Sequence, residues 1–400
     1  MTTRSVLISG ASISGPALAW WLNAAGWRTT VVERFGELRD TGQNIDVRGA
    51  AREVVRRMGL EDAALAATTG ERGTVFVGRD GRALAEFPAG ETDTSGATAE
   101  MEILRGELSR LLYEHTCGET EYVFGDRITA LDDHGDGVAA TFEHGPERTF
   151  DVVVIAEGLT SRTRALVFPQ AEITSLGLYT AYLTIPRSTS DTDWWRWYNA
   201  PRGRSITLRP DNLGTTRATL SFMSDVGGLE DLEPDDQARV LRRTFADAGW
   251  ETPRILDALD GTPFYFDLTG QMRLPAWSNG RRVMVGDAAY CASPLSGMGT
   301  SLALVGAYVL AGELATHDDH RAAFARYEAV MRPYVDGAQQ LPPGTPRIAH
   351  PRTRAGVALL RAGIRVVGSA PVKRLAGLGG SLFSPPADKL ELPQYPATVR

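Results

Sequence analysis

The chain of 400 residues has 42 Lys and Arg against 49 Asp and Glu, a formal net charge of −7, and 43% of its residues are hydrophobic. This composition is typical of a soluble globular protein with a sizeable core, and it disfavours nucleic acid or an anionic membrane as the main partner. Its two cysteines, Cys117 and Cys291, stand in neither a disulfide nor a metal-ligand spacing. The longest apolar run, near residues 302–311, is too short to span a membrane. We therefore expect a cytoplasmic protein of two or three domains with no signal peptide and no bound metal.

The first 34 residues predict a strand, a tight turn, a helix and a second strand. The turn carries a Gly-x-Ser-x-x-Gly pattern in the context of the dinucleotide-binding fingerprint, where a pyrophosphate rests on the helix N-terminus. Glu33 ends the second strand, where a carboxylate binds a ribose hydroxyl. This context favours an adenine dinucleotide over a purely structural turn. The expected binding residues of the turn are Gly10, Ser12, Ile13, Ser14 and Gly15, with Ser12 in place of the usual middle glycine.

The middle of the chain predicts short helices, a hairpin over residues 75–87 and a polar loop over residues 91–98. Arg105 precedes a predicted helix, where its guanidinium could reach a phosphate or a flavin or could remain solvated; spacing alone leaves the two equal. A fully buried strand at residues 151–156 ends in Glu157-Gly158, which places an acidic side chain at a sheet edge.

Residues 174–269 predict antiparallel strands rich in aromatic residues, followed by an amphipathic helix near residues 235–248. On the tryptophan strand, the period of two places Trp195 and Trp197 on one face and Trp194, Arg196 and Tyr198 on the other. Such a wall suits a flat aromatic ligand. A sheet that simply buries its large residues explains the pattern equally well.

The stretch from Gly286 to Gly299 follows a short apolar strand and precedes a long apolar helix. Asp287 at the strand end offers an acceptor for a ribityl hydroxyl, and the Gly297-Met298-Gly299 backbone can approach a flat ring closely. The helix directs its positive end at the same place, where a reduced flavin needs positive potential beside N1 and C2=O. Taken alone, this stretch is more simply explained as an ordinary strand-turn-helix. The two upstream motifs, the fingerprint turn and the strand that ends in Glu157-Gly158, favour a flavin site instead.

Together, Gly10-x-Ser12-x-x-Gly15 with Glu33-Arg34, Ala156-Glu157-Gly158 with Arg162, and Gly286-Asp287 with Pro294 and Gly297 resemble the class A, single-component FAD-dependent aromatic monooxygenases. The resemblance covers nearly the whole chain and is closest to the short branch of tetracycline-modifying and polyketide-tailoring enzymes. It implies an α/β (α+β) fold with a Rossmann-like FAD-binding domain at residues 1–173 and 270–340. A β-sheet substrate domain is expected at residues 174–269, which residues 75–97 could join, and a helical tail at residues 341–400.

The resemblance also implies roles for single residues. Glu33 and Arg34 would hold the adenosine, Asp46 and Arg105 the flavin and its linker, and Asp287 the ribityl chain. The isoalloxazine would be lined by Pro294, Gly297, Met298 and Gly299. Arg39 would contact the nicotinamide cofactor, and Tyr182 and Arg204 the substrate, beside the wall of Trp195 and Trp197. Two residues depart from the family pattern: Glu157 stands where aspartate is usual, and Tyr290 where histidine is common.

The implied chemistry belongs to a non-covalent FAD. NADPH or NADH reduces the flavin, O2 adds at C4a, and the hydroperoxide delivers one oxygen atom to a small polycyclic aromatic or polyketide-like substrate. No catalytic acid or base is nominated, and a monomer or a homodimer is expected. A flavin oxidase or dehydrogenase on the same fold and a non-catalytic flavoprotein that binds an aromatic ligand remain the alternatives.

Overall fold

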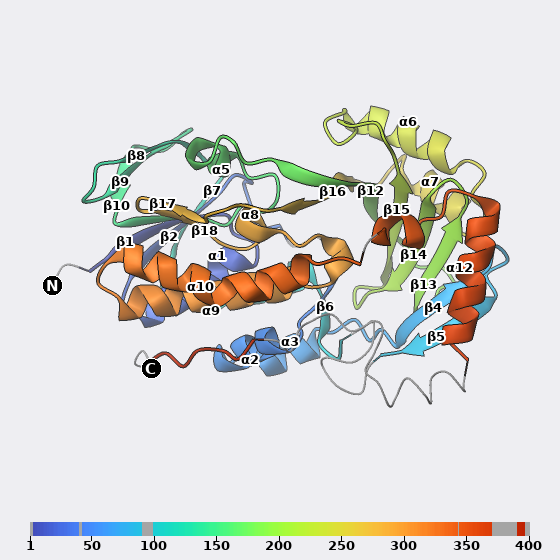
Figure 1. Ribbon diagram of the computed structural model, residues 1–400, viewed down its shortest axis with the longest axis horizontal. Helices are drawn as coiled ribbons and strands as arrows, with labels where there is room; N and C mark the ends of the chain where they lie inside the picture. The colour runs from blue at the N-terminus through green and yellow to red at the C-terminus, as the bar shows by residue number, and fades with distance from the viewer. Residues whose placement is uncertain (1–2, 40–41, 90–98, 343, 370–389, 397–400) are drawn as a thin grey trace.

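The computed structural model describes residues 3–39, 42–89, 99–342, 344–369 and 390–396. Two regions lie side by side, one built on a parallel sheet and one on a larger, mostly antiparallel sheet (Figure 1). The predicted fold class, an α/β chain with a second sheet, is therefore confirmed. The predicted loop at residues 91–98 and most of the predicted tail beyond residue 369 lie outside the described residues.

The first sheet has the strand order β17-β18-β11-β1-β2-β7, and all of its pairings are parallel except that of β17. Its centre is the predicted fingerprint strand, β1, which is buried on both faces as parallel strands usually are. The strands are β1 (Ser5–Ser9), β2 (Arg28–Glu33), β7 (Glu121–Phe124), β11 (Val152–Ile155), β17 (Ser278–Asn279) and β18 (Arg282–Met284).

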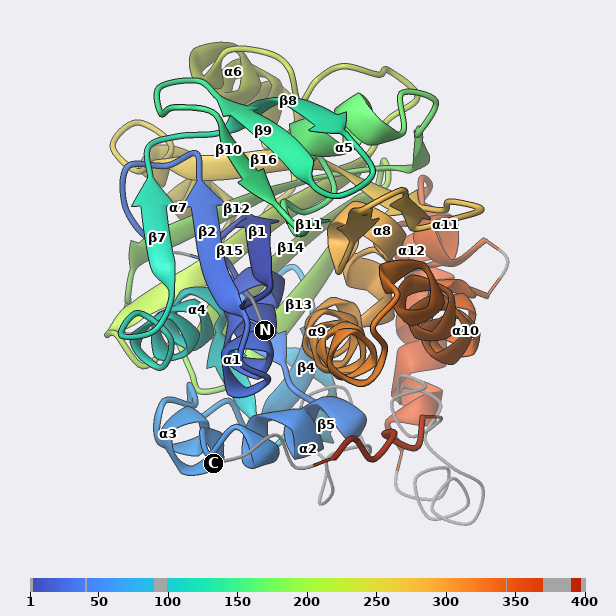
Figure 2. The ribbon, with the colours of Figure 1, turned by 90° about the vertical axis from the view of Figure 1, so that its left-hand side faces the viewer.

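Two different layers cover the faces of this sheet, as Figure 2 shows. Because side chains alternate along β1, Val6 and Ile8 pack with the helices, whereas Leu7 packs against a small antiparallel sheet. The helical layer includes α1 (Ser14–Ala24), α9 (Gly299–Thr316) and α10 (His320–Gln339). The small sheet consists of β8 (Ile128–Asp133), β9 (Val138–Phe142) and β10 (Arg148–Phe150).

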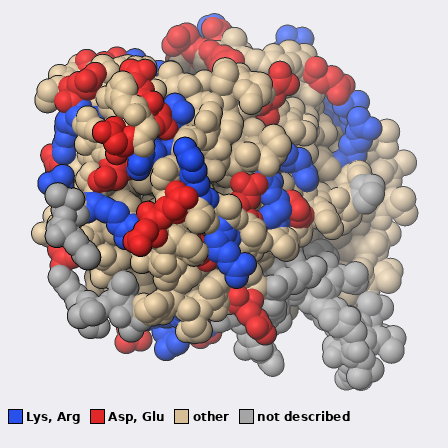
Figure 3. Space-filling model, turned by 60° about the vertical axis from the view of Figure 1, so that its left-hand side comes forward, with Lys and Arg blue, Asp and Glu red and all other residues tan. Residues whose placement is uncertain are grey.

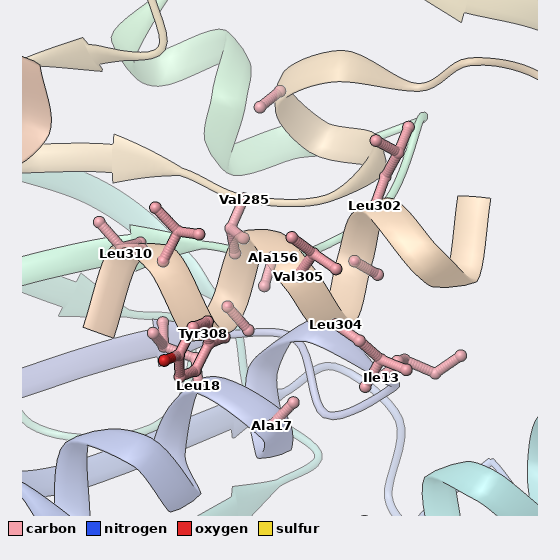
Figure 4. Packing of buried hydrophobic residues seen from close by; sticks show 14 of the residues in the cluster. Ile13, Ala17, Leu18, Ala156, Val285, Leu302, Leu304, Val305, Tyr308 and Leu310 are labelled. Carbon is pink, nitrogen blue, oxygen red and sulfur yellow. The ribbon is translucent and has the colours of Figure 1, made fainter. Parts of the chain in front are cut away.

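Helix α9 is the central helix of the core. Among the described residues it is the one helix long and apolar enough to cross a membrane, but 78% of it is buried inside the protein. In Figure 4, Tyr308 and Leu304 of this helix lie on the side of α1, where Tyr308 is next to Leu18, whereas Leu302 points to the opposite side. A helix that is apolar on all sides belongs in a core when its neighbours cover it, and α1, α2 (Ala50–Arg57) and α10 do so here.

The second sheet has seven strands in the order β16-β12-β15-β14-β13-β4-β5. The predicted hairpin near residues 75–87 supplies β4 and β5, which extend the sheet beyond the tryptophan strand β13. One face packs on α6 (Pro234–Phe245) and α7 (Thr252–Ala258). The strands are β4 (Gly73–Val77), β5 (Ala83–Pro88), β12 (Ile173–Pro186), β13 (Trp195–Ala200), β14 (Arg204–Pro210), β15 (Thr215–Met223) and β16 (Phe264–Met272).

Shorter elements connect the two regions. A two-stranded ribbon, β3 (Asn44–Asp46) with β6 (Glu102–Leu104), lies at the junction, and the amide of Asn44 donates to Pro210 O of β14 at 2.9 Å. Basic and acidic side chains are interspersed on the face seen in Figure 3. The remaining helices are α3 (Glu61–Ala66), α4 (Arg105–Glu114), α5 (Arg162–Val167), α8 (Asp287–Tyr290), α11 (Thr345–Ala349) and α12 (Arg354–Val367).

Candidate functional site

Close backbone contacts shape the turn between β1 and α1. Gly10 adopts a φ of +111°, and a Cβ at this position would lie 2.5 Å from the carbonyl oxygen of Ala156. A Cβ at Gly15 would lie 1.9 Å from the carbonyl oxygen of Gly10. Only glycine tolerates both positions, so the N-terminus of α1 is held at the carboxyl end of the parallel sheet with its unpaired N–H groups exposed to a ligand.

Two serines of this turn meet residues from distant parts of the chain. Nη1 of Arg105 donates to Ser12 Oγ at 2.9 Å, so the serine that replaces a glycine serves as a hydrogen-bond partner. Burial lowers the pKa of Arg105. Ser14 lies beside Gly286, where a Cβ would come within 2.4 Å of Ser14 Oγ. Ile13, by contrast, is a core residue. The first and third predicted motifs therefore form one site.

Glu33 lies at the end of β2 beside the fingerprint turn. One carboxylate oxygen accepts the N–H of Ala11 at 2.9 Å and the other accepts the N–H of Phe35 at 3.1 Å. Since a carboxylate has about four acceptor positions, Glu33 keeps capacity for ribose hydroxyls. The guanidinium groups of Arg34 and Arg39 lie 4.8 and 4.6 Å from the centre of the Phe35 ring.

Asp46 is bound to other protein groups. Its carboxylate accepts the N–H of Ala99 at 3.0 Å and pairs with Arg48 at 3.2 Å. Arg48 is fully buried, and its backbone N–H donates to Ser301 of α9 at 3.4 Å. Arg48 was not predicted from the sequence, although its spacing of two residues from Asp46 is the strand period that brings two side chains to one side.

Asp287 has few partners. Gly286, with a φ of +67°, caps α8 and leaves the Asp287 carboxylate at the edge of the sheet. Among the described residues, the one donor that acts on its carboxylate is the thiol of Cys291, a weak donor whose Sγ also donates to Gly270 O at 3.7 Å, and burial raises the pKa of Asp287. A Cβ at Gly299 would lie 3.9 Å from Asp287 Oδ1, so the first turn of α9 stands beside this carboxylate.

The loop that follows contains Ser293, which has a strained backbone, and Met298, which is buried. Ser293 has a φ of +77°, and its buried Oγ lacks a hydrogen-bond partner among the described residues. Pro294 and Gly297 are exposed beside it. The side chain of Met298 is fully buried in the core, so only its backbone could line a ligand. The reason is that Met298 directly precedes α9 and packs with that helix.

Glu157 and Tyr290, the two departures from the family pattern, both form hydrogen bonds with other parts of the protein. The Glu157 carboxylate accepts hydrogen bonds from Ser9 Oγ, Ser161 Oγ, and both the Oγ1 and the backbone N–H of Thr163. It therefore connects β1 to the start of α5. Tyr290 lies in the core, where its hydroxyl is 3.0 Å from that of Tyr327.

The two faces of the seven-stranded sheet have different neighbours. Arg204 was expected to contact the substrate, but it lies on the face that packs on α6. Its guanidinium donates to Pro201 O and Thr244 O, each at 2.7 Å, and to Asp247 at 2.6 Å. The expectation was wrong, because Arg204 shares its face with Ile206, which belongs to the core formed with the helices. Tyr182, Trp195 and Trp197 lie on the opposite face.

That opposite face carries a row of stacked side chains. The guanidinium of Arg209 lies 4.4 Å from the Trp195 ring centre, Trp195 and Trp197 are 5.1 Å apart, and Trp197 and Phe76 are 5.8 Å apart. Arg209 in turn forms ion pairs with two buried carboxylates, Glu71 at 2.7 Å and Glu102 of β6 at 3.2 Å. This face is therefore directed at the fingerprint region, and we refer to it as the inner face.

Three carboxylates near this face were not predicted from the sequence. Glu102 sits beside Glu71 in a buried place where two carboxylates share Arg209, and desolvation raises its pKa to about 8. Asp267 and its neighbour Tyr265 lie on β16, a strand that was not predicted. Among the described residues, no group of His, Cys, Asp and Glu side chains could hold a metal ion.

Comparison with known families agrees with this geometry. A family model described as an FAD binding domain matches residues 3–338. The chain belongs to this FAD-binding family. A flavin-dependent monooxygenase of Legionella longbeachae is 36% identical over 84% of this chain and 87% of its own length. The FAD-dependent monooxygenase asL4 of Sarocladium schorii is 32% identical over the whole of both chains.

Solved structures agree as well. The tetracycline destructase Tet(55) superposes with a TM-score of 0.79 at 31% identity, covering 98% of this chain and 99% of that protein. Tet(51) gives the same TM-score at 28% identity. The protein is thus an FAD-dependent monooxygenase of class A, near the tetracycline-modifying and polyketide-tailoring branch.

Proposed function

We propose that this monooxygenase uses NADH or NADPH and O2 to insert one oxygen atom into a polycyclic aromatic or polyketide-like molecule that binds between the flavin and the inner face. The observation that carries the proposal is the asymmetry of the seven-stranded sheet. Its outer face is covered by α6 and α7, whereas its inner face presents aromatic side chains toward the fingerprint region. Aromatic surfaces of this kind suit flat apolar ligands.

The residues present fit a non-covalent FAD. Glu33 and Arg34 would hold the adenosine, and the turn from Gly10 to Gly15, which leads into α1, would receive the pyrophosphate. Arg105 would contact the flavin linker, and Asp287 would accept a ribityl hydroxyl, because its carboxylate has only a weak thiol donor. Arg39 would contact the nicotinamide cofactor. When bound, the flavin supplies the redox chemistry, and the protein supplies orientation and excludes water.

The relatives narrow the choice of substrate class. The structures with a TM-score of 0.79 are named tetracycline destructases, so tetracycline and hydroxyanthraquinones are the first compounds to screen. Addition of a substrate should stimulate NADH or NADPH oxidation by the FAD-loaded enzyme.

Mass spectrometry of product formed under 18-O2 tests the reaction. A product heavier by one 18-O atom supports monooxygenation. Hydrogen peroxide with an unlabelled product would identify an oxidase instead. Aromatic binding without any stimulated oxidation would identify a flavoprotein that only binds its ligand.

A further inference from the structure

One corner of the inner face combines two phenols with a carboxylate. Tyr182 on β12 stands directly opposite Tyr265 on β16, and their rings stack with centres 6.1 Å apart. The Tyr265 hydroxyl donates to Oδ2 of Asp267, and the other oxygen of Asp267 accepts the N–H of Leu268 at 2.8 Å. Period two places Asp267 on the inner face with both tyrosines.

This corner faces the expected flavin site from the side of the sheet. Arg39 and Arg105, at the fingerprint end, interact electrostatically with Tyr265. The charge of Asp267 contributes to the raised pKa of Cys291, which lies in the loop after Asp287. Tyr265 and Asp267 therefore interact electrostatically with groups at both the fingerprint turn and the loop after Asp287.

Asp267 takes part in no ion pair that the described residues form, and no cation is among the groups that shift its pKa. Tyr265 is 49% exposed, so one phenol remains open to a ligand. Burial raises the pKa of Asp267, and the nearby Glu230 and Asp231 add to the rise. Tyr182 and Cys291 are the other titratable groups in electrostatic contact with it. A carboxylate with a raised pKa that is bonded to an accessible phenol is a candidate for acid–base chemistry.

We propose that Tyr265 and Asp267 form the acid–base pair that takes the proton from a hydroxyl group of the aromatic substrate. This inference rests on the proposed function. The substrate O–H bond breaks as its proton passes to the Tyr265 oxygen, and the Tyr265 proton passes to Asp267 Oδ2. The negative charge thus moves from Asp267 to the substrate oxygen, and no oxidant is needed. An ionised ring is richer in electrons and reacts more readily with an electrophilic oxygen.

Alizarin, a hydroxyanthraquinone whose colour reports its ionisation, provides a test that needs no turnover. At a pH where free alizarin is neutral, the FAD-loaded enzyme should bind it as the coloured anion. Tyr265→Phe, which removes only one hydroxyl, and Asp267→Asn should bind it as the neutral form. Tyr179→Phe is the matched control, since its hydroxyl donates to Val226 O on the outer face, and it should behave as the wild type does.

Three results would overturn the proposal: neutral alizarin in the wild-type complex, anionic alizarin in both variants, or no alizarin binding at all. Flavin content and thermal midpoint, measured for each variant, show whether it has folded. If Tyr265→Phe failed to fold, Asp267→Asn would carry the same test.

Turnover separates this proposal from the proposed function. For a hydroxylated substrate, each variant should lower kcat/KM by about 100-fold, while the methyl ether of that substrate, which has no proton to lose, should be unaffected. An equal loss of kcat/KM for both compounds would show that Tyr265 and Asp267 have only a structural role, and would overturn the proposal. Absence of 18-O incorporation with anionic alizarin binding intact would refute the monooxygenase reaction and keep the pair.

Discussion

Glu157 and Asp287 occupy equivalent places in the same sheet, each at the carboxyl end of a parallel strand and beside a glycine. Their surroundings differ completely. Four donors from three residues bind the Glu157 carboxylate, whereas Asp287 has only a weak thiol donor among the described residues. A buried polar group costs free energy until it is hydrogen-bonded. The comparison teaches that a carboxylate satisfied by the protein holds the fold together, and one left unsatisfied is available to a ligand.

The largest effect should come from removing the satisfied carboxylate. We expect Glu157→Ala to lower the free energy of unfolding by about 3 kcal/mol or more, because it leaves several buried donors of Ser9, Ser161 and Thr163 without an acceptor. Denaturant titration measures this. Glu157→Asp, which keeps the charge, should leave flavin retention nearly intact. Loss of flavin from a stably folded Glu157→Asp protein would break the comparison.

Removing the unsatisfied carboxylate should affect the ligand instead. We expect Asp287→Ala to weaken FAD binding by roughly 1–3 kcal/mol, because a buried ribityl hydroxyl would lose its acceptor. The free energy of unfolding of the FAD-free protein should change little. Fluorescence titration of FAD released by acid and added back gives the dissociation constant. Equal flavin loss in Asp287→Ala and Glu157→Asp would contradict the assigned roles.

The same distinction applies to the two faces of the seven-stranded sheet. Trp197→Ala should weaken the binding of a turned-over aromatic substrate by roughly 1–3 kcal/mol, the scale of one large apolar contact, with flavin content unchanged. Tyr198→Phe is the control, because it removes only an outer-face hydroxyl that donates to Ala248 O. Substrate titration of both variants checks the prediction. Weaker binding in Tyr198→Phe alone would indicate that the substrate binds the outer face, and would contradict the prediction.

Glu102 should make the stability of the protein depend on pH, because it is a buried carboxylate that shares Arg209 with Glu71. Its pKa is about 8 in the folded protein against an ordinary value of 4.5. The folded state therefore binds more protons than the unfolded state between these values, and stability should fall as pH rises from 4.5 to 8. Glu102→Gln, neutral at every pH, should remove this decline and should be more stable than the wild type above pH 8. Thermal melts across the pH range would show it, and an unchanged pH profile would contradict it.

The local elements could be predicted because their signals are local. The fingerprint turn, the strand ending at Glu33 and the long helix after Gly299 all follow from apolar periodicity and glycine position, and the structure has each of them within a few residues. Strand β16 was missed, and Tyr265 and Asp267 with it, because a nine-residue edge strand that mixes polar and aromatic residues carries a weak pattern.

The sequence by itself determined which residues share a strand face and which stretches carry the flavin motifs. Only the tertiary structure decided which face of the sheet points to the fingerprint region. It places Arg204 on the outer face, against α6, and Trp197 on the inner face. Alternation assigns residues to faces, but both faces carry large side chains, and the helices that cover one of them are distant in sequence. The contrast between Glu157 and Asp287 could not be predicted from the sequence either. Whether a carboxylate is hydrogen-bonded depends on donors such as Ser9, which reach it only when the chain has folded.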